Sequence, residues 1–196
     1  MPHSIRLATA ADAEQMQAIY APYCFTPISF EAAPPTVDEM RGRIEKTMEH
    51  YPWVVLDDAG EILGYAYATR HRERSAYRWS VDATVYVRQG KHRRGLGRAL
   101  YISLLAVLPL QGYVNAYAGV TLPNPASVGL HQAVGFEPVG VYKHVGFKLG
   151  IWHDVAWFVR ALQVPPGEPS EPKPLMKVYR TTEWENGLQS GLVSFP

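Results

Sequence analysis

The chain has 196 residues, of which 47% are hydrophobic and 19% charged, and its formal net charge is +1. This length suits one domain with an appendage, and the composition excludes disorder for most of the chain. A net charge so near zero argues against a nucleic-acid binder. The single cysteine, Cys24, excludes a disulfide framework and a thiolate zinc site, and seven scattered histidines without HExxH spacing give no support for a bound metal.

Periodic hydrophobic residues and turn signals divide most of the chain into strands and helices. In chain order, the patterns predict a strand at 5–8, helices at 13–20 and 37–51, strands at 53–56, 62–69 and 77–87, a helix at 98–108, a strand at 114–122, a helix at 124–134, and strands at 139–147 and 154–162. Capping boxes beginning at Thr9 and Thr36 precede the first two helices. In 77–87, strict alternation places Val81 on one face and Asp82 on the other.

The composition changes after Leu162. We therefore expect one domain at 1–162, a proline-rich linker at 163–174 and a C-terminal tail at 175–196. The tail is too short for a domain; it is either disordered or folded back onto the body or a partner.

We expect no membrane segment. Residues 99–136 lack Asp, Glu, Lys and Arg, but Pro109, Gly112 and Pro123 interrupt the run, which favours buried elements over a spanning helix. The first residues lack the apolar core of a secretory signal. With the unpaired cysteine, these features favour the cytoplasm.

The strongest local motif is a basic, glycine-containing loop between the strand at 77–87 and the next helix. It runs His92-Arg93-Arg94-Gly95-Leu96-Gly97-Arg98. Glycines let backbone amides approach a ligand, and the helix that follows presents free N–H groups and the positive end of its dipole. These features predict a pyrophosphate site, although a solvated basic turn has the same composition.

The order of the elements resembles that of the GNAT acetyltransferase superfamily, whose Arg/Gln-x-x-Gly-x-Gly loop binds the acetyl-CoA pyrophosphate. A second GNAT signature follows in the right order, in which Asn124, Ser127, Leu130, His131, Gly135 and Phe136 match the pattern. The segments at 76–87, 122–124 and 150–155 further resemble phosphinothricin N-acetyltransferases. The resemblance covers residues 5–162 and implies an α/β (α+β) fold. Its central sheet is mixed, mostly antiparallel and twisted, and is flanked by helices.

The resemblance implies acetyl-CoA as co-substrate, a homodimer, and no metal. It places the backbone of the strand along pantetheine and the loop around pyrophosphate, with Asn124 bonded to the pantetheine arm. The residues implied for acetyl-CoA are Val85, Tyr86, Val87, Arg93, Arg94, Gly95, Leu96, Gly97, Arg98 and Asn124. The Val87 N–H is the expected donor to the oxyanion.

Asp82 is the expected general base, at a position where the family carries Glu. An α-ammonium is almost fully protonated near pH 7, so acetylation needs a proton acceptor. Asp is one CH₂ shorter than Glu, which favours a relay through water. Composition alone favours a strand carboxylate bonded to backbone or arginine, and it is the match to the family's position that favours the base. His131 stands at the signature position and is expected to protonate the thiolate or relay a proton, although a lone histidine on an apolar helix is more often structural.

The resemblance also implies a pocket for an amino acid with an anionic tail. Arg72, Arg74 and Tyr77 match the family segment that holds the anionic groups, and Phe30 matches an aromatic wall. The alternative for residues 70–74 is a solvated loop with internal ion pairs.

The expected activity is N-acetylation of phosphinothricin, methionine sulfoximine or methionine sulfone by direct attack in a ternary complex. Two alternatives remain at this stage: an acetyltransferase for another amine or a peptide N-terminus, and a non-catalytic acyl-CoA sensor in which Asp82 marks a disabled base.

Overall fold

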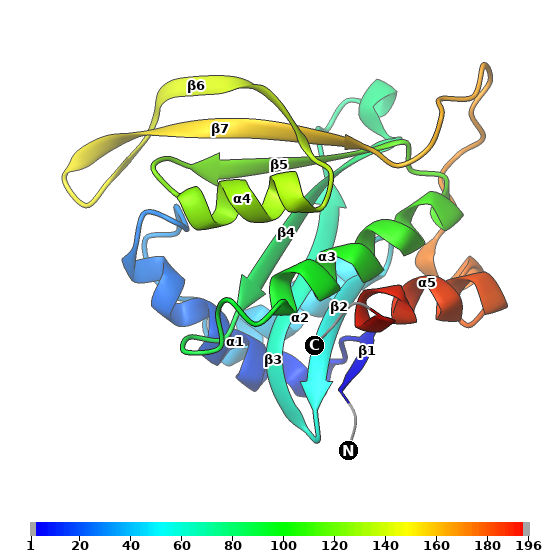
Figure 1. Ribbon diagram of the computed structural model, residues 1–196, viewed down its shortest axis with the longest axis horizontal. Coiled ribbons are helices and arrows are strands. Elements are labelled where there is room, and N and C mark those ends of the chain that lie inside the picture. The colour runs from blue at the N-terminus through cyan, green and yellow to red at the C-terminus, as the bar shows by residue number, and fades with distance from the viewer. Residues whose placement is uncertain (1–2, 194–196) are drawn as a thin grey trace.

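A computed structural model describes residues 3–193 and shows one seven-stranded sheet with helices on both faces (Figure 1). The strands are β1 (Ser4–Leu7), β2 (Trp53–Asp58), β3 (Glu61–Arg70), β4 (Ser80–Val87), β5 (Asn115–Thr121), β6 (Glu137–Lys148) and β7 (Ile151–Ala161). The α-helices are α1 (Ala13–Tyr20), α2 (Val37–Met48), α3 (Leu96–Val107), α4 (Pro125–Ala133) and α5 (Thr182–Val193). Short 3₁₀ segments are η1 (Ala10–Asp12), η2 (Ala21–Phe25), η3 (Ser75–Tyr77), η4 (Leu108–Gln111) and η5 (Leu175–Lys177).

The strand order is β1-β2-β3-β4-β5-β7-β6, and every neighbouring pair is antiparallel except β4 and β5. The parallel pair extends over only three positions, Ser80 to Asp82 against Asn115 to Tyr117. The sheet is therefore mixed and mostly antiparallel, which confirms the fold class predicted from the sequence.

The two faces of the sheet carry two hydrophobic cores. One packs α3, α4 and α5 against residues such as Val81 and Ala83, and the other packs α1 and α2 against Tyr65. On β4, Val81 is fully buried in the first core, whereas Tyr86 packs against the second. The predicted alternation of this strand is confirmed, and Asp82 lies on the face of α1 and α2.

Most element boundaries lie within two residues of the sequence prediction, and three differ by three residues: the end of α2, the start of β4 and the start of β7. Helix α2 ends at Met48 rather than at residue 51, because Pro52 disfavours the helical conformation in the residue before it, and the His50 N–H already bonds the Thr47 carbonyl (3.1 Å) in a tighter 3₁₀-type turn. Strand β4 begins at Ser80 rather than at 77, because the preceding residues form η3. There the Arg78 N–H bonds the Ser75 carbonyl at 3.1 Å.

The C-terminal segment folds back onto the body. Its buried side chains belong to the same core as α3 and the sheet, and they are Leu175, Val178, Trp184 and Leu188. Helix α5 lies beside α3 (Figure 1), where the Ser103 Oγ donates to the Leu188 carbonyl at 2.6 Å. The two helices pack so closely that a Cβ atom at Gly191 of α5 would overlap the carbonyl oxygen of Ala99 in α3. The proline-rich segment lies along the body too, where the Trp79 Nε1–H donates to the Ser170 carbonyl at 2.8 Å.

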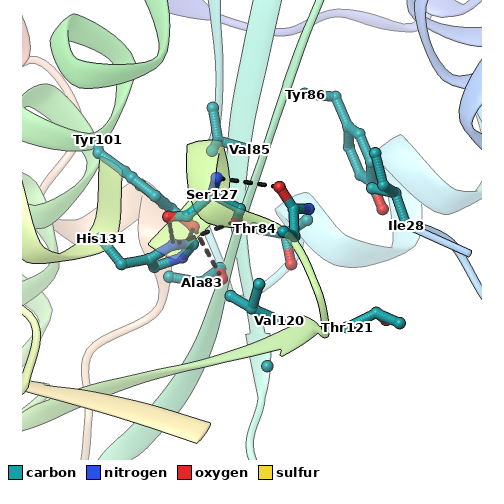
Figure 2. Close-up of a pocket in the computed structure, with 12 residues that line it drawn as sticks. Ile28, Ala83, Thr84, Val85, Tyr86, Tyr101, Val120, Thr121, Ser127 and His131 are labelled. Carbon is teal, nitrogen blue, oxygen red and sulfur yellow. Dashed lines mark hydrogen bonds between the residues drawn. The ribbon is translucent and has the colours of Figure 1, made fainter. Parts of the chain in front are cut away.

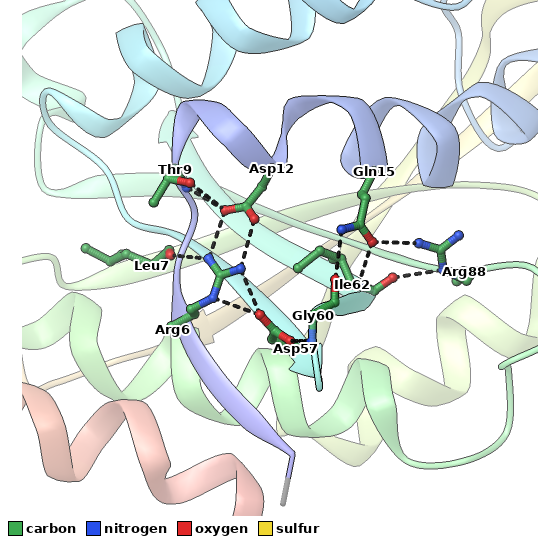
Figure 3. Close-up of polar contacts among 9 residues, drawn as sticks. All are labelled: Arg6, Leu7, Thr9, Asp12, Gln15, Asp57, Gly60, Ile62 and Arg88. Atoms are coloured by element: carbon green, nitrogen blue, oxygen red, sulfur yellow. Dashed lines mark hydrogen bonds and ion pairs between the residues drawn. The ribbon is translucent and has the colours of Figure 1, made fainter. Parts of the chain in front are cut away.

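An ion-pair network joins β1, η1 and the end of β2 (Figure 3). The Arg6 guanidinium donates to both carboxylate oxygens of Asp12 at 2.8 Å and to Asp57 at 2.9 and 3.0 Å. Burial by itself raises the pKa of Asp12, but the bonds from Arg6 and from the Thr9 N–H outweigh it, so the pKa of Asp12 is lowered overall. The network fixes the start of α1 to the edge of the sheet.

Because the folded-state pKa of Asp12 lies below its unfolded value of about 4, its contribution to stability is present above that value. It is lost as pH falls through the folded pKa. We expect Asp12→Asn to lower the free energy of unfolding by about 1–3 kcal/mol at pH 7. The difference in Tm from wild type is expected to shrink below about pH 4. Asp38→Asn, on the exposed surface of α2, is the matched control; a pH-independent Tm difference for Asp12→Asn would contradict the assignment.

Candidate active site

Strands β4 and β5 diverge directly after Asp82 and Tyr117, and a pocket occupies the opening (Figure 2). Figure 2 shows Tyr101 and His131 on one side of this pocket and Ile28 and Tyr86 on the other. The remaining lining comes from the ends of both strands and the start of α4: Ala83, Thr84, Val85, Gly119, Val120, Thr121, Asn124 and Ser127. The opening gives a ligand access to the exposed edge of β4.

The polar backbone groups of β4 alternate between its two neighbours. The Arg88 N–H bonds the Leu63 carbonyl of β3 at 2.8 Å, so in this antiparallel register the even-numbered residues of β4 bond β3. The odd-numbered residues point toward β5. Consistent with this alternation, Ala83 and Val87 turn their carbonyls away from β3 and accept from Tyr101 (3.2 Å) and Tyr23 (2.5 Å). The N–H groups of Val85 and Val87 therefore face the opening.

Two buried side chains form the inner wall of the pocket. The His131 Nδ1–H donates to the Ser127 carbonyl at 2.7 Å, and its Nε2 lies 3.0 Å from the Tyr101 Oη. Burial lowers the pKa of His131 despite the opposing hydrogen bond to Ser127, and burial raises the pKa of Tyr101. At neutral pH the pocket therefore presents a neutral imidazole and a neutral phenol.

The basic loop opens helix α3 as the sequence predicts. Gly95 is the N-cap of α3 and has a φ of 78°, and Arg93 has a φ of 61°. The Ala99 N–H is bonded to the Gly95 carbonyl (2.9 Å), so the N–H groups of Leu96, Gly97 and Arg98 precede the first helical hydrogen bond and are free for a ligand. Beside the loop, His92 Nε2 lies 2.8 Å from the Tyr23 Oη, which also contacts Val87. This contact ties the loop to the edge of β4.

Asn124 is the N-cap of α4, where its Oδ1 accepts from the Ser127 N–H at 3.1 Å. That bond directs the oxygen into the helix and leaves the amide nitrogen for other partners. Asn124, Val85 and Tyr86 all line the pocket between the strands.

Asp82 lies at the mouth of the opening and pairs with His71. The Nδ1 of His71 is 2.6 Å from the Asp82 Oδ1. Burial raises the pKa of the Asp82 carboxyl, and the bond from His71 and the charge of Arg72 act in the opposite direction. The sequence-based alternative of a carboxylate bonded to backbone or arginine is thus replaced by a histidine pair.

The expected substrate residues fall into two groups. Arg72 and Tyr77 lie around His71. The Tyr77 ring meets the His71 ring edge-on at 6.0 Å, and the Arg72 guanidinium lies 5.3 Å from the ring of Trp157, which itself meets the His71 ring edge-on. Phe30 lies apart from them, against the backbone of Gly146 on β6. Arg74 is exposed at the start of η3.

Lys148 holds the segment that carries Phe30. Its Nζ donates to the carbonyls of Cys24 (2.7 Å), Ser29 (2.5 Å) and Glu31 (2.8 Å). The β6–β7 hairpin therefore fixes the loop that supplies Ile28 to the pocket. Sequence reasoning did not single out Lys148, and nothing in its neighbouring residues would have indicated this role.

Sequence reasoning also missed His71, Tyr101 and Tyr23. For His71 one signal was present in its position in the chain. His71 directly follows β3, and Thr69, near the end of that strand, pairs with Asp82. For Tyr101 and Tyr23, the partners are backbone carbonyls on a strand distant in sequence, which no local pattern reveals.

Metal-binding clusters and membrane-spanning helices are both absent from residues 3–193. Residues 3–193 contain no group of three or more His, Cys, Asp and Glu side chains placed to hold a metal ion. Within the same range, no helix has both the length and the apolar character needed to cross a membrane.

A diverging strand pair, a basic loop at a helix N-terminus and a partly buried carboxylate together suit a site for acyl transfer. Residues 5–157 match the acetyltransferase (GNAT) domain family. The chain belongs to this family, so the predicted enzyme class is confirmed.

The chain is similar to named relatives along most of its length. It is 39% identical over 173 residues to a phosphinothricin N-acetyltransferase from Streptomyces viridochromogenes, covering 87% of this chain and 94% of the relative. It is 35% identical over 160 residues to an L-methionine sulfoximine/L-methionine sulfone acetyltransferase from Pseudomonas aeruginosa, covering 80% and 93%.

Among solved structures, a GNAT superfamily phosphinothricin acetyltransferase from Sinorhizobium meliloti in complex with acetyl-CoA has a TM-score of 0.78 and 35% identity. The match covers 94% of this chain and 99% of that one. A putative acetyltransferase from Salmonella typhimurium, also with acetyl-CoA, has a TM-score of 0.82 and 27% identity, covering 87% and 99%.

Proposed function

We propose that this enzyme transfers the acetyl group of acetyl-CoA to the amine of phosphinothricin or a related amino acid such as methionine sulfoximine or methionine sulfone. One observation carries the proposal: the opening between β4 and β5 begins beside a partly buried carboxylate, in a chain 39% identical to a phosphinothricin N-acetyltransferase. The relative that acts on methionine sulfoximine and sulfone supports the wider substrate class.

The edge of β4 and the start of α3 are suited to hold acetyl-CoA. The N–H of Val85 would bond the pantetheine arm, and the N–H of Val87 would donate to the oxyanion, a contact that can be worth about 3 kcal/mol in the transition state. Arg93, Arg94 and Arg98 with the free amides of Leu96 and Gly97 would surround the pyrophosphate. The amide nitrogen of Asn124 would bond the pantetheine arm as well.

In the reaction, the substrate ammonium first loses one proton to the acid–base group at Asp82. The free amine then attacks the thioester carbon, forming the C–N bond as the carbonyl electron pair moves to oxygen. When the pair returns, the C–S bond breaks and the thiolate takes the second proton lost by nitrogen. The net change is one amide, one thiol and one proton released to solvent. Because His131 is neutral and faces Tyr101, we assign it to orientation and proton relay rather than to direct protonation of the thiolate.

The anionic end of the amino acid would meet Arg72, Arg74 and Tyr77. Arginine suits this role because its planar fork binds carboxylates and phosphinates through two parallel hydrogen bonds. Arg74 is exposed and free to reorient toward a ligand. Phe30, half exposed beside the hairpin, would form the aromatic wall.

The backbone assignment predicts a residue-specific pattern of amide exchange. Acetyl-CoA is expected to slow hydrogen exchange at Val85 and Val87, whose N–H groups face the opening. Thr84 and Tyr86 are the internal controls, because their N–H groups already bond β3. Amide exchange followed by NMR with and without acetyl-CoA measures this difference. Equal protection at all four residues would contradict the alternation.

The substrate assignment predicts selective turnover. Release of free thiol from acetyl-CoA is measured with phosphinothricin, methionine sulfoximine, methionine sulfone, glutamate and a short peptide. We expect turnover with the first three, a kcat about 10²–10⁴-fold lower in Asp82→Asn, and an effect mainly on KM in Arg74→Ala. Arg41→Ala, on the exposed side of α2, is the matched arginine control.

Other outcomes of this measurement have definite meanings. Turnover of the peptide alone, indifferent to Arg74, would replace the substrate class. Binding of acetyl-CoA without turnover of any amine would identify an acyl-CoA sensor.

We further propose that the enzyme is a homodimer. The β6–β7 hairpin forms the edge of the sheet and exposes many large apolar side chains, each more than 40% accessible: Val139, Val141, Tyr142, Val145, Phe147, Leu149, Ile151 and Trp152. Apolar edge strands of this kind are commonly covered by a partner, and a second copy supplies a self-complementary surface. The cytoplasmic location stays a prediction.

Phe147 and Trp152 are opposite each other on this hairpin, with ring centroids 5.4 Å apart. The double variant Phe147→Glu/Trp152→Glu is expected to be a monomer at micromolar concentration where wild type is a dimer. Light scattering after size-exclusion chromatography gives the mass of each. Val164→Glu, which changes an 88% exposed residue outside the hairpin, is the control. A monomeric wild type would overturn the proposal.

A further inference from the structure

The pair formed by His71 and Asp82 has the features of a built acid–base unit. The two side chains are 2.6 Å apart and mostly buried, with exposed fractions of 10% for His71 and 26% for Asp82. They come from different segments: Asp82 from β4, and His71 from the loop that follows β3. A hydrogen bond of this length between partly desolvated groups is strong and directional.

Aromatic rings fix the plane of the His71 imidazole. It stacks on Tyr117 of β5, with centroids 4.2 Å apart and planes 15° apart. Tyr77 of η3 and Trp157 of β7 meet it edge-on at 6.0 and 6.2 Å. The titratable and charged groups that face the ring are therefore Asp82, the phenols of Tyr117 and Tyr77, and Arg72 of its own loop.

The carboxylate determines the tautomer of this imidazole. An ionised Asp82 only accepts hydrogen bonds, so the His71 Nδ1 carries the proton and donates it. Nε2 is then left with its lone pair on the opposite edge of the ring. A neutral histidine held in this way by a carboxylate is an effective general base, because the imidazolium that forms is stabilised by the adjacent negative charge.

The position of the pair matches the chemistry. Asp82 and Tyr117 are the last paired positions of β4 and β5, and the opening begins with the next residues. The imidazole bonds the Asp82 carboxylate and stacks on Tyr117, the last paired residue of β5, so it lies beside the point where the two strands diverge. Arg72 and Tyr77, both assigned to the substrate, surround the same ring.

We propose that His71 is the catalytic base of this enzyme, and that Asp82 is a positioning residue that holds its tautomer and stabilises its charge. The inference rests on the acetyl transfer proposed above. The substrate ammonium gives one proton to the His71 Nε2, and the amine lone pair is then free to attack the thioester carbon. The imidazolium later returns its proton to solvent, so the balance of the reaction is unchanged. A relay through His71 takes the place of the water expected from the sequence.

The test compares pH profiles of kcat for wild type, His71→Phe and His71→Ala, using the amine that wild type acetylates fastest. Phe keeps a flat ring against Tyr117 but has no basic nitrogen. We expect kcat to fall about 10²–10⁴-fold in both variants, and the acidic limb of the wild-type profile to disappear. Added imidazole is expected to restore part of the activity of His71→Ala. Calorimetry is expected to give an unchanged Kd for acetyl-CoA in every variant.

His50→Ala is the matched control, because His50 is exposed and lies in the turn after α2; it is expected to keep the wild-type kcat and profile. A wild-type kcat and acidic limb in His71→Phe would overturn the proposal and leave Asp82 as the base. A change in KM alone, or a folded His71→Ala that imidazole does not rescue, would instead make His71 an anchor of the substrate loop. A wild-type enzyme that transfers no acetyl group to any amine would overturn the proposed function and this inference together.

Discussion

The short parallel contact between β4 and β5 controls the rest of the site. Had the two strands paired along their full length, the odd-numbered amides of β4 would bond β5 and no pocket would form. They pair at only three positions, and Val85 and Val87 are left to present backbone donors inside an otherwise apolar sheet. Buried backbone groups without partners cost free energy, so this arrangement favours a ligand that satisfies them.

The neutral and the charged side chains of the site lie on opposite sides of that opening. On the α3 side, the pocket wall is the neutral pair of Tyr101 and His131, and burial keeps both uncharged at neutral pH. On the α1 and α2 face, Asp82 is the carboxylate nearest the opening, and His71 is bonded to it. The charged groups at the opening therefore lie on the face of α1 and α2, while the opposite wall stays neutral. In the proposed reaction, this separation limits the number of groups that compete for the substrate proton.

The sequence predicted the elements that depend on local signals. Capping boxes, the alternation of β4 and the glycine loop before α3 are encoded within a few residues, and all are present. The pairing of His71 with Asp82 could not be predicted in the same way, because it needs the loop after β3 to bring an imidazole over Tyr117 from another strand. The same holds for Lys148, whose three carbonyl partners belong to a segment far away in the chain. Contacts of this kind depend on tertiary packing rather than on periodicity.

The packing of α5 brings its last turn into contact with the helix that is proposed to bind the pyrophosphate. Gly191 lies against the carbonyl of Ala99, which belongs to the first turn of α3, directly after the basic loop. A side chain at this position would push on the same turn whose free amides face the expected pyrophosphate. A polypeptide ending at Leu162 would uncover the apolar strip of α3 on which Trp184 and Leu188 rest, and would expose it to aggregation. The C-terminal segment thus supports α3, whose first turn is the proposed binding site of the pyrophosphate.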